Sequence, residues 1–160
     1  MFDFSEKDSC GVGFIASRNI PPTHGMTLKV LECLANLDHR GAKFADGTGD
    51  GAGVLTEIPF ELIRAELEEL DIDHDSNKKI GIISCFFDPK NVDESIELIN
   101  NELQIFEIKQ LYWRKVPTDK QILGTLARES KPSIYQGIVS AENESAKDFE
   151  KKLYLFRKTL

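Results

Sequence analysis

Apolar residues recur at helical spacing in two long stretches of the chain. The first stretch steps by four, four and three residues through Met26, Val30, Leu34 and Leu37. The second steps by four, three, four and three through Val92, Ile96, Ile99, Leu103 and Phe106. Such spacing lines one face of an α-helix. The sequence therefore predicts a helix over each stretch, with its apolar face turned toward a core.

Three further helices are predicted from the residues at their starts. Pro59 suits a first helical turn, and apolar residues follow it at helical spacing in Phe60, Ile63, Leu67 and Leu70. The pairs Thr118 with Gln121 and Ser145 with Asp148 each fit the capping-box pattern. The last of these helices reaches the final residue without a glycine stop, so we expect the polypeptide to continue.

Short apolar or β-branched runs between the helices predict strands at residues 11–16, 54–58, 79–87, 108–116 and 133–140. Strands and helices then alternate along the chain, without internal repeats. This pattern indicates an α/β or α+β fold and leaves the strand order open.

Composition limits the classes of function. The chain has 160 residues, 41% of them hydrophobic, which suits one domain or part of one. Its net charge is -7 and its basic residues are scattered, so we expect no nucleic acid or membrane partner. No stretch of 18 apolar residues and no secretory leader is found, so we expect a cytoplasmic location.

The three cysteines are far apart in sequence, and neither a disulfide framework nor a zinc site is indicated. Cys33 and Cys85 lie within apolar patterns and are interpreted as core residues. Cys10 is different, because removal of residues 1–9 would make it N-terminal. Its α-amine, with a pKa of about 7.7 to 8, would then serve as the base for its own thiol. The alternative is that Cys10 is a small buried residue at the start of a strand.

A glycine-rich run, Gly47-Thr48-Gly49-Asp50-Gly51-Ala52-Gly53, follows the first helix. It lacks the Lys-Ser/Thr of a phosphate-binding P-loop, so a tight structural loop is the simpler interpretation. Arg40, just before Gly41, suits either a carboxylate clamp or a helix-end cap. His24 and His74 have no second ligand at metal spacing.

Taken together, these segments resemble a known family. The chain contains, in this order, Cys10-Gly-Val-Gly-Phe-Ile-Ala, His39-Arg-Gly-Ala, Asp46 with Thr48-Gly-Asp-Gly-Ala-Gly53, Pro59-Phe60 and the segment 149–158. These segments are similar, in the same order, to the class II glutamine amidotransferase domain of the glutamate synthase large subunit. The resemblance covers nearly the whole chain. It implies an α+β fold of the N-terminal nucleophile hydrolase type, a four-layer αββα sandwich of which this chain holds the first part.

The resemblance also implies how the chain works. Residues 1–9 would be a leader propeptide, and residues 10–160 the first part of the amidotransferase domain. Cys10 would attack the side-chain amide of L-glutamine, giving a thioester, ammonia and finally glutamate. Arg40 and Gly41, with Asp50 and Gly51, would lie in the vicinity of the substrate.

Partners and cofactors follow from the same resemblance. The remaining glutamate synthase domains, and as a further candidate a small subunit, would be partners. They would use ammonia to aminate 2-oxoglutarate with FMN and an iron-sulfur cluster, while this chain would hold no cofactor or metal. The electron donor and oligomeric state stay open.

The family's Asn-Gly oxyanion pair and its arginine for the glutamine α-carboxylate have no match in this sequence. We therefore expect little or no glutaminase activity from the 160 residues alone, because one lost oxyanion donor costs about 10²- to 10³-fold in rate. Two other interpretations stay open. One is a self-standing α/β binding module with a structural Cys10 and an anion-binding glycine loop. The other is a different class II amidotransferase, which the run from Gly47 to Gly53 disfavours.

Overall fold

The computed structural model describes residues 11–19, 23–49, 51–73, 79–142 and 144–160. The chain forms two compact units. The first comprises Met1–Glu57 and Asp119–Ser130, and the second comprises Ile58–Thr118 and Lys131–Leu160.

The second unit is built on a three-stranded antiparallel sheet. The strands are β1 (Lys79–Phe87), β2 (Lys109–Lys115) and β3 (Ser133–Ala141), in the order β1-β3-β2. Lys79 is opposite Ala141 in the first pairing, and Lys109 is opposite Ser140 in the second. β3 is therefore the central strand, and β1 and β2 each leave one edge unpaired among the described strands.

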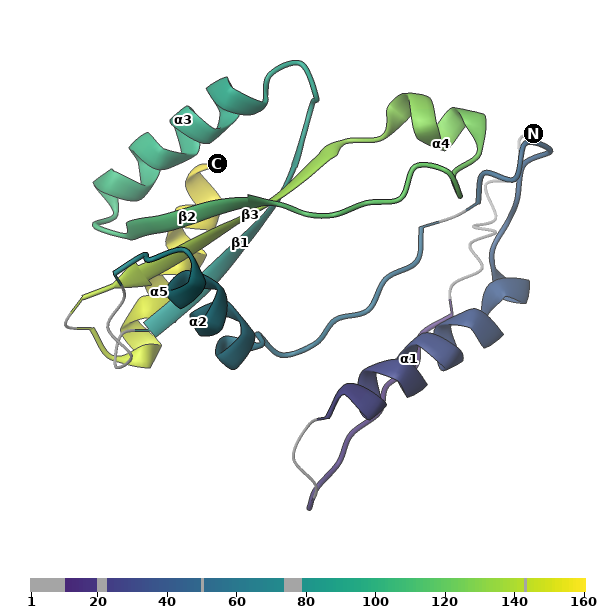
Figure 1. Ribbon diagram of the computed structural model, residues 1–160, viewed down its shortest axis with the longest axis horizontal. Coiled ribbons are helices and arrows are strands. Elements are labelled where there is room, and N and C mark those ends of the chain that lie inside the picture. Colours follow the sequence, from purple (N-terminus) through teal and green to yellow (C-terminus); the bar gives the residue numbers. More distant parts are fainter. Residues whose placement is uncertain (1–10, 20–22, 50, 74–78, 143) are drawn as a thin grey trace, which may run out of the picture. The chain divides into compact units, whose positions relative to one another are not determined.

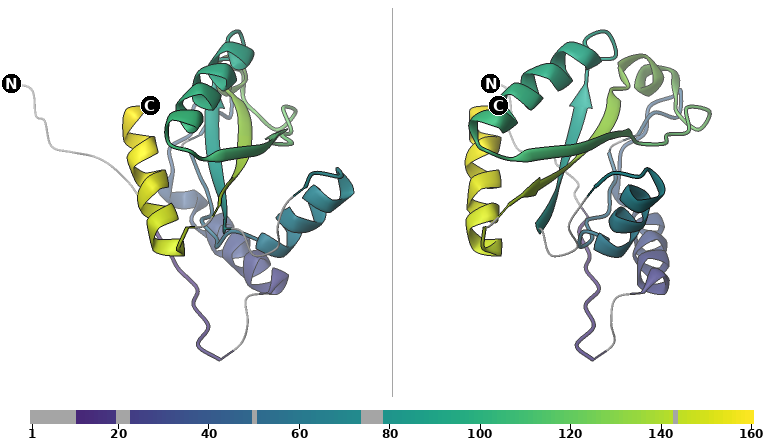
Figure 2. Two further views of the ribbon diagram at one scale, coloured as in Figure 1. Left: turned by 90° about the vertical axis from the view of Figure 1, so that its left-hand side faces the viewer. Right: turned by 60° about the vertical axis from the view of Figure 1, so that its left-hand side comes forward.

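Helices cover both faces of this sheet (Figures 1 and 2). α3 (Val92–Ile105) and α5 (Ala146–Thr159) lie on one face, where Leu103, Val139 and Phe149 belong to the larger apolar core. α2 (Phe60–Glu69) lies on the other face, where Leu67 and Ile138 belong to a smaller core. This cover explains the continuous apolar sequence of β1, since successive side chains point to opposite faces and both faces are packed.

The strand predicted at residues 79–87 is confirmed with the same bounds, although β1 is an edge strand and its Phe86 is 68% exposed. α5 starts where the capping-box pattern predicts. Ser145 is its N-cap, and the hydroxyl oxygen of Ser145 accepts a hydrogen bond from the backbone N–H of Asp148 at 3.2 Å. Local sequence signals thus define most of the second unit.

The first unit contains α1 (His24–Asn36), the 3₁₀ turn η1 (Asp38–Arg40) and α4 (Thr125–Ser130). The predicted apolar face of α1 is only half-buried, and no residue of this helix is buried. Cys33 on α1 is exposed, so its interpretation as a core residue is wrong. Cys85 on β1 is half-buried, and burial raises the pKa of its thiol, in keeping with a residue beside the core.

Two of the predicted strands are wrong. Residues 11–16 and 54–58 form no strand, because neither segment pairs with a partner among the described residues. The helix predicted from Thr118 begins instead at Thr125. The α+β class holds, with one small antiparallel sheet, and the second sheet of a four-layer sandwich is not found in the described part of the chain. Within those residues, no helix is long and apolar enough to cross a membrane.

Candidate functional site

Two of the predicted site residues, Cys10 and Asp50, lie outside the described residues. The structure describes Arg40, Gly41 and Gly51 and the immediate neighbour of Cys10, which is Gly11. All of these belong to the first unit.

Arg40 is placed by the turn that follows α1. The backbone N–H of Arg40 donates to the carbonyl of Leu37 at 2.8 Å, and the N–H of Gly41 donates to the carbonyl of Asp38 at 3.3 Å. The residue next to Cys10 lies against this turn. A β-carbon added to Gly11 would be 3.1 Å from Cδ2 of Leu37 and 3.5 Å from Cγ of Arg40. The start of the motif around Cys10 and the His39-Arg-Gly-Ala motif are therefore neighbours in space.

A short hairpin turn leads from Gly41 into the glycine-rich run. Lys43 and Gly49 form an isolated antiparallel bridge. Between them, the N–H of Phe44 donates to the carbonyl of Thr48 at 2.7 Å, and the N–H of Gly47 donates to the carbonyl of Phe44 at 3.0 Å. Gly47 has a φ of +83°, a left-handed conformation that favours glycine. The turn therefore requires glycine at position 47.

Asp46 and Thr48 tie this turn to α4, a contact that the sequence did not reveal. Asp46 Oδ2 accepts a hydrogen bond from the N–H of Leu126 at 3.0 Å, and Thr48 Oγ1 accepts a weaker one from the N–H of Ala127 at 3.4 Å. Asp46 also accepts from the N–H of Thr48 at 3.0 Å and from its hydroxyl at 2.8 Å. The two side chains thus occupy N–H groups at the start of α4 that the helix itself leaves unpaired.

This contact explains why the predicted start of α4 is wrong. The Thr118 pattern supplies no cap, because the cap comes from Asp46, which lies 80 residues from Leu126 in sequence. Gly124 permits the close approach, since a β-carbon there would be 2.3 Å from Thr48 Oγ1 and 2.6 Å from Thr48 N. A lone glycine before a helix was the only sequence signal of this junction.

The bonds to Asp46 also set its ionisation. Hydrogen bonds from the N–H of Leu126, then from the N–H and hydroxyl of Thr48, lower the pKa of Asp46 from 3.8 to about 2. Donors stabilise the charged form of a carboxylate, and this exposed side chain loses little hydration. Asp46 is therefore an anion throughout the physiological pH range.

The glycines of the run do not all have the same structural role. Gly47 has its positive φ, and a β-carbon on Gly49 would be 3.4 Å from the carbonyl oxygen of Ala42. A β-carbon on Gly51 or Gly53 would meet no atom within 4 Å in the described part of the chain outside its sequence neighbours, and neither residue has a positive φ. Steric need in this structure thus accounts for glycine in the turn, while it gives no reason for glycine at positions 51 and 53.

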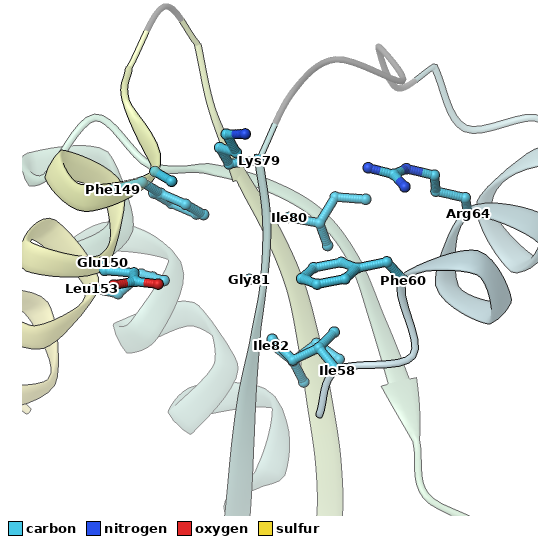
Figure 3. Close-up of a pocket in the computed structure, with 11 residues that line it drawn as sticks. Ile58, Phe60, Arg64, Lys79, Ile80, Gly81, Ile82, Phe149, Glu150 and Leu153 are labelled. Carbon is cyan, nitrogen blue, oxygen red and sulfur yellow. The ribbon is translucent and has the colours of Figure 1, made fainter. Parts of the chain in front are cut away.

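A separate groove lies in the second unit along the open edge of β1. Figure 3 shows Phe60 and Arg64 of α2 on one side of the strand and Phe149, Glu150 and Leu153 of α5 on the other. The cavity volume is about 480 Å³. None of the residues predicted to act on substrate lines it. Across the described ranges, no group of three or more His, Cys, Asp or Glu side chains gathers as a metal site.

The family model and the similar proteins assign this chain to the same family. The family model of the class II glutamine amidotransferases matches residues 10–160. The chain is 36% identical to the ferredoxin-dependent glutamate synthase of Pyropia yezoensis, over 97% of this chain and 10% of that protein. It is 34% identical to the NADH glutamate synthase of Saccharomyces cerevisiae, over 96% of the chain and 8% of that protein.

The large chain of the NADPH glutamate synthase of Bacillus subtilis is also 34% identical, over 96% of this chain and 10% of its own length. The chain thus spans about a tenth of the length of the relatives it matches. The resemblance found in the sequence is confirmed: this chain belongs to the class II glutamine amidotransferase family, in a branch whose relatives are glutamate synthases.

Proposed function

We propose that this chain is the nucleophile-bearing part of a glutamate synthase amidotransferase domain, and that Cys10 is its catalytic nucleophile. In this proposal residues 1–9 are a leader whose removal frees the α-amine of Cys10. The observation that supports it most is the contact of Gly11 with Arg40 and Leu37. It brings the residue bonded to Cys10 against the motif that the family resemblance associates with the substrate.

The chemistry needs only one residue to start. The free α-amine takes the proton of the Cys10 thiol, directly or through one water, and the thiolate attacks the amide carbon of glutamine. The tetrahedral intermediate collapses as the ammonium returns its proton to the leaving nitrogen, so that ammonia departs and a thioester remains. Water then hydrolyses the thioester to glutamate and restores the thiol.

Arg40 is proposed to act near the nucleophile. A guanidinium is charged at every relevant pH and favours a nearby thiolate over the neutral thiol. Gly41, Asp50 and Gly51 are proposed to border the substrate. Ammonia would pass to other domains of the parent enzyme, which we propose to hold FMN and an iron-sulfur cluster and to aminate 2-oxoglutarate. A small subunit remains a candidate partner.

The alternative of an anion-binding glycine loop is less well supported. The backbone N–H groups of Leu126 and Ala127 lie at the start of α4, and they already donate to Asp46 and Thr48 of the turn. A bound anion would also face the ionised carboxylate of Asp46. Like charges at close range repel each other, so the carboxylate of Asp46 disfavours the binding of an external anion at the start of α4.

Two measurements test the proposed function. The mature protein should have the intact mass of a polypeptide that begins at Cys10, and Cys10→Ala should abolish glutamine hydrolysis by the complete amidotransferase domain. The 160 residues alone should hydrolyse little or no glutamine, since the family's oxyanion pair has no match here. A fully active protein that keeps residues 1–9 would contradict the proposal.

A further inference from the structure

We propose that Asp46 is a positioning residue of the amidotransferase site, which holds the glycine-rich run in place by bonding it to the start of α4. This inference rests on the proposed function of Cys10 and Arg40. It adds a role for Asp46 and for a segment around residue 126 that neither the family match nor the motifs assign.

The contacts form a continuous path through the first unit. Asp46 holds the N–H of Leu126 and both donors of Thr48. The carbonyl of Thr48 accepts the N–H of Phe44, and the next residue, Gly49, is bridged to Lys43.

Beyond the bridge, Gly49 lies against the carbonyl of Ala42, two residues after Arg40. Arg40 in turn lies against Gly11, the neighbour of Cys10. A shift of the turn would therefore move Gly49 relative to Ala42 and Arg40.

Both carboxylate oxygens of Asp46 accept hydrogen bonds. Oδ2 of Asp46 accepts from two donors, the N–H of Leu126 at 3.0 Å and the hydroxyl of Thr48 at 2.8 Å, while Oδ1 accepts from the N–H of Thr48 at 3.0 Å. An asparagine could keep its one oxygen at the Oδ2 position and would then lose only the local bond from the N–H of Thr48. Asp46→Ala removes both oxygens, so this variant should release α4.

α4 is well suited to serve as an anchor. Its first turn offers N–H groups that the helix cannot satisfy itself, and Gly124 lets the backbone of Thr48 approach closely. The contact joins residues 46–48 to residues 124–127. These two segments are far apart in sequence, so a local motion of the turn does not move α4 with it. Misplacement of about 1 Å can cost on the order of 10²-fold in an enzyme reaction, which makes such an anchor worth testing.

The experiment uses the complete amidotransferase domain that begins at Cys10, the mature form under the proposed function. The first readout is hydrogen exchange at the amides of Leu126 and Ala127. The second is the ratio of two rate constants for Cys10, one for iodoacetamide, which carries a carboxamide like that of glutamine, and one for methyl methanethiosulfonate, which does not. Peptide-resolved mass spectrometry separates Cys10 from Cys33 and Cys85.

The variants are Asp46→Ala, Thr48→Val, Thr48→Ser and Asp119→Ala. Asp119 is the matched control because its carboxylate accepts the N–H of Gln121 at 2.8 Å, the same local bond that Asp46 makes to Thr48. We expect Asp46→Ala to speed exchange at Leu126 and Thr48→Val to speed exchange at Ala127. Both variants should bring the ratio toward that of free cysteine. Thr48→Ser and Asp119→Ala should keep both readouts.

The outcomes separate the two proposals. If Asp46→Ala speeds exchange at Leu126 but keeps the wild-type ratio, Asp46 is only a structural cap and the inference is overturned while the proposed function stands. If exchange at Leu126 is the same in wild type and Asp46→Ala, the anchor itself is wrong. If the wild type already has the ratio of free cysteine, the proposed function fails before any variant is compared. Should Asp46→Ala not fold, the Thr48→Val and Thr48→Ser pair decides by exchange at Ala127 and by the same ratio.

Discussion

Gly11 lies against Arg40, with Cγ of the arginine 3.5 Å from the position of a glycine β-carbon. Gly11 is bonded to Cys10, so this contact places the residue next to the proposed nucleophile against the turn that carries Arg40. The contact joins two motifs that are separate in sequence, and it supports a site built within the first unit.

The first prediction concerns Arg40. Arg40→Ala should slow the reaction of Cys10 with iodoacetamide at pH 7 by about fivefold, because removal of one cation near a thiolate costs roughly 1 kcal/mol. Arg18→Ala, which removes another exposed arginine of the same unit, is the control. Equal rates for the two variants would argue against a role for Arg40 at the nucleophile.

The second prediction concerns Gly137 in β3. A β-carbon there would be 2.9 Å from the ring of Trp113, whose indole N–H donates to Asn100 Oδ1 at 2.9 Å. Gly137→Ala should lower the free energy of unfolding by about 1–3 kcal/mol, as overpacking does. The fluorescence of Trp113, the single tryptophan, reports the unfolding. A β-carbon on Gly13 would meet nothing within 4 Å among the described residues, so Gly13→Ala should change the free energy of unfolding by less than about 0.5 kcal/mol.

The third prediction gives two serines opposite effects. Ser140 is 1% exposed, and its hydroxyl has no hydrogen-bond partner among the described residues. Ser140→Ala should therefore stabilise the second unit by about 1 kcal/mol. Ser145 caps α5, so Ser145→Ala should destabilise the unit by about 1 kcal/mol. Chemical denaturation measures both, and a loss of stability in Ser140→Ala would show that its hydroxyl is satisfied.

The fourth prediction follows from the low pKa of Asp46. A carboxyl group whose pKa falls from 3.8 to about 2 on folding favours the folded state above pH 3.8, and this contribution is lost as the pH falls through about 2. The NMR amide signal of Leu126 should therefore shift with a midpoint near pH 2. Asp46→Asn should remove that transition. A Leu126 signal that stays constant from pH 5 to below pH 2 would show that the bond to Asp46 is absent.

Elements with local signals could be predicted from the sequence. The run of β-branched and aromatic residues defines β1, and the Ser145 cap defines the start of α5. α4 could not be placed, since its N–H groups are capped by Asp46 from a distant part of the sequence. The strands expected at residues 11–16 and 54–58 needed a pairing partner, and propensity alone cannot supply one.

The candidate site shows the same division. The motifs around Cys10 and Arg40 could be recognised because their residue types and order are distinctive. The contact of Gly11 with Arg40, and the bonds from Asp46 to α4, depend on how the chain folds back on itself. Spacing in the sequence carries no information about such contacts, and only the structure could bring Asp46 and Leu126 together.

The central claim is that the α-amine of Cys10 activates its own thiol. The most direct measurement compares the pH dependence of Cys10 alkylation by iodoacetamide in two forms of the protein, one that begins at Cys10 and one that keeps residues 1–9, with the exposed Cys33 as an internal reference. The account predicts that Cys10 reacts faster than Cys33 near neutral pH only in the form that begins at Cys10. Identical rate profiles for Cys10 in both forms would contradict it.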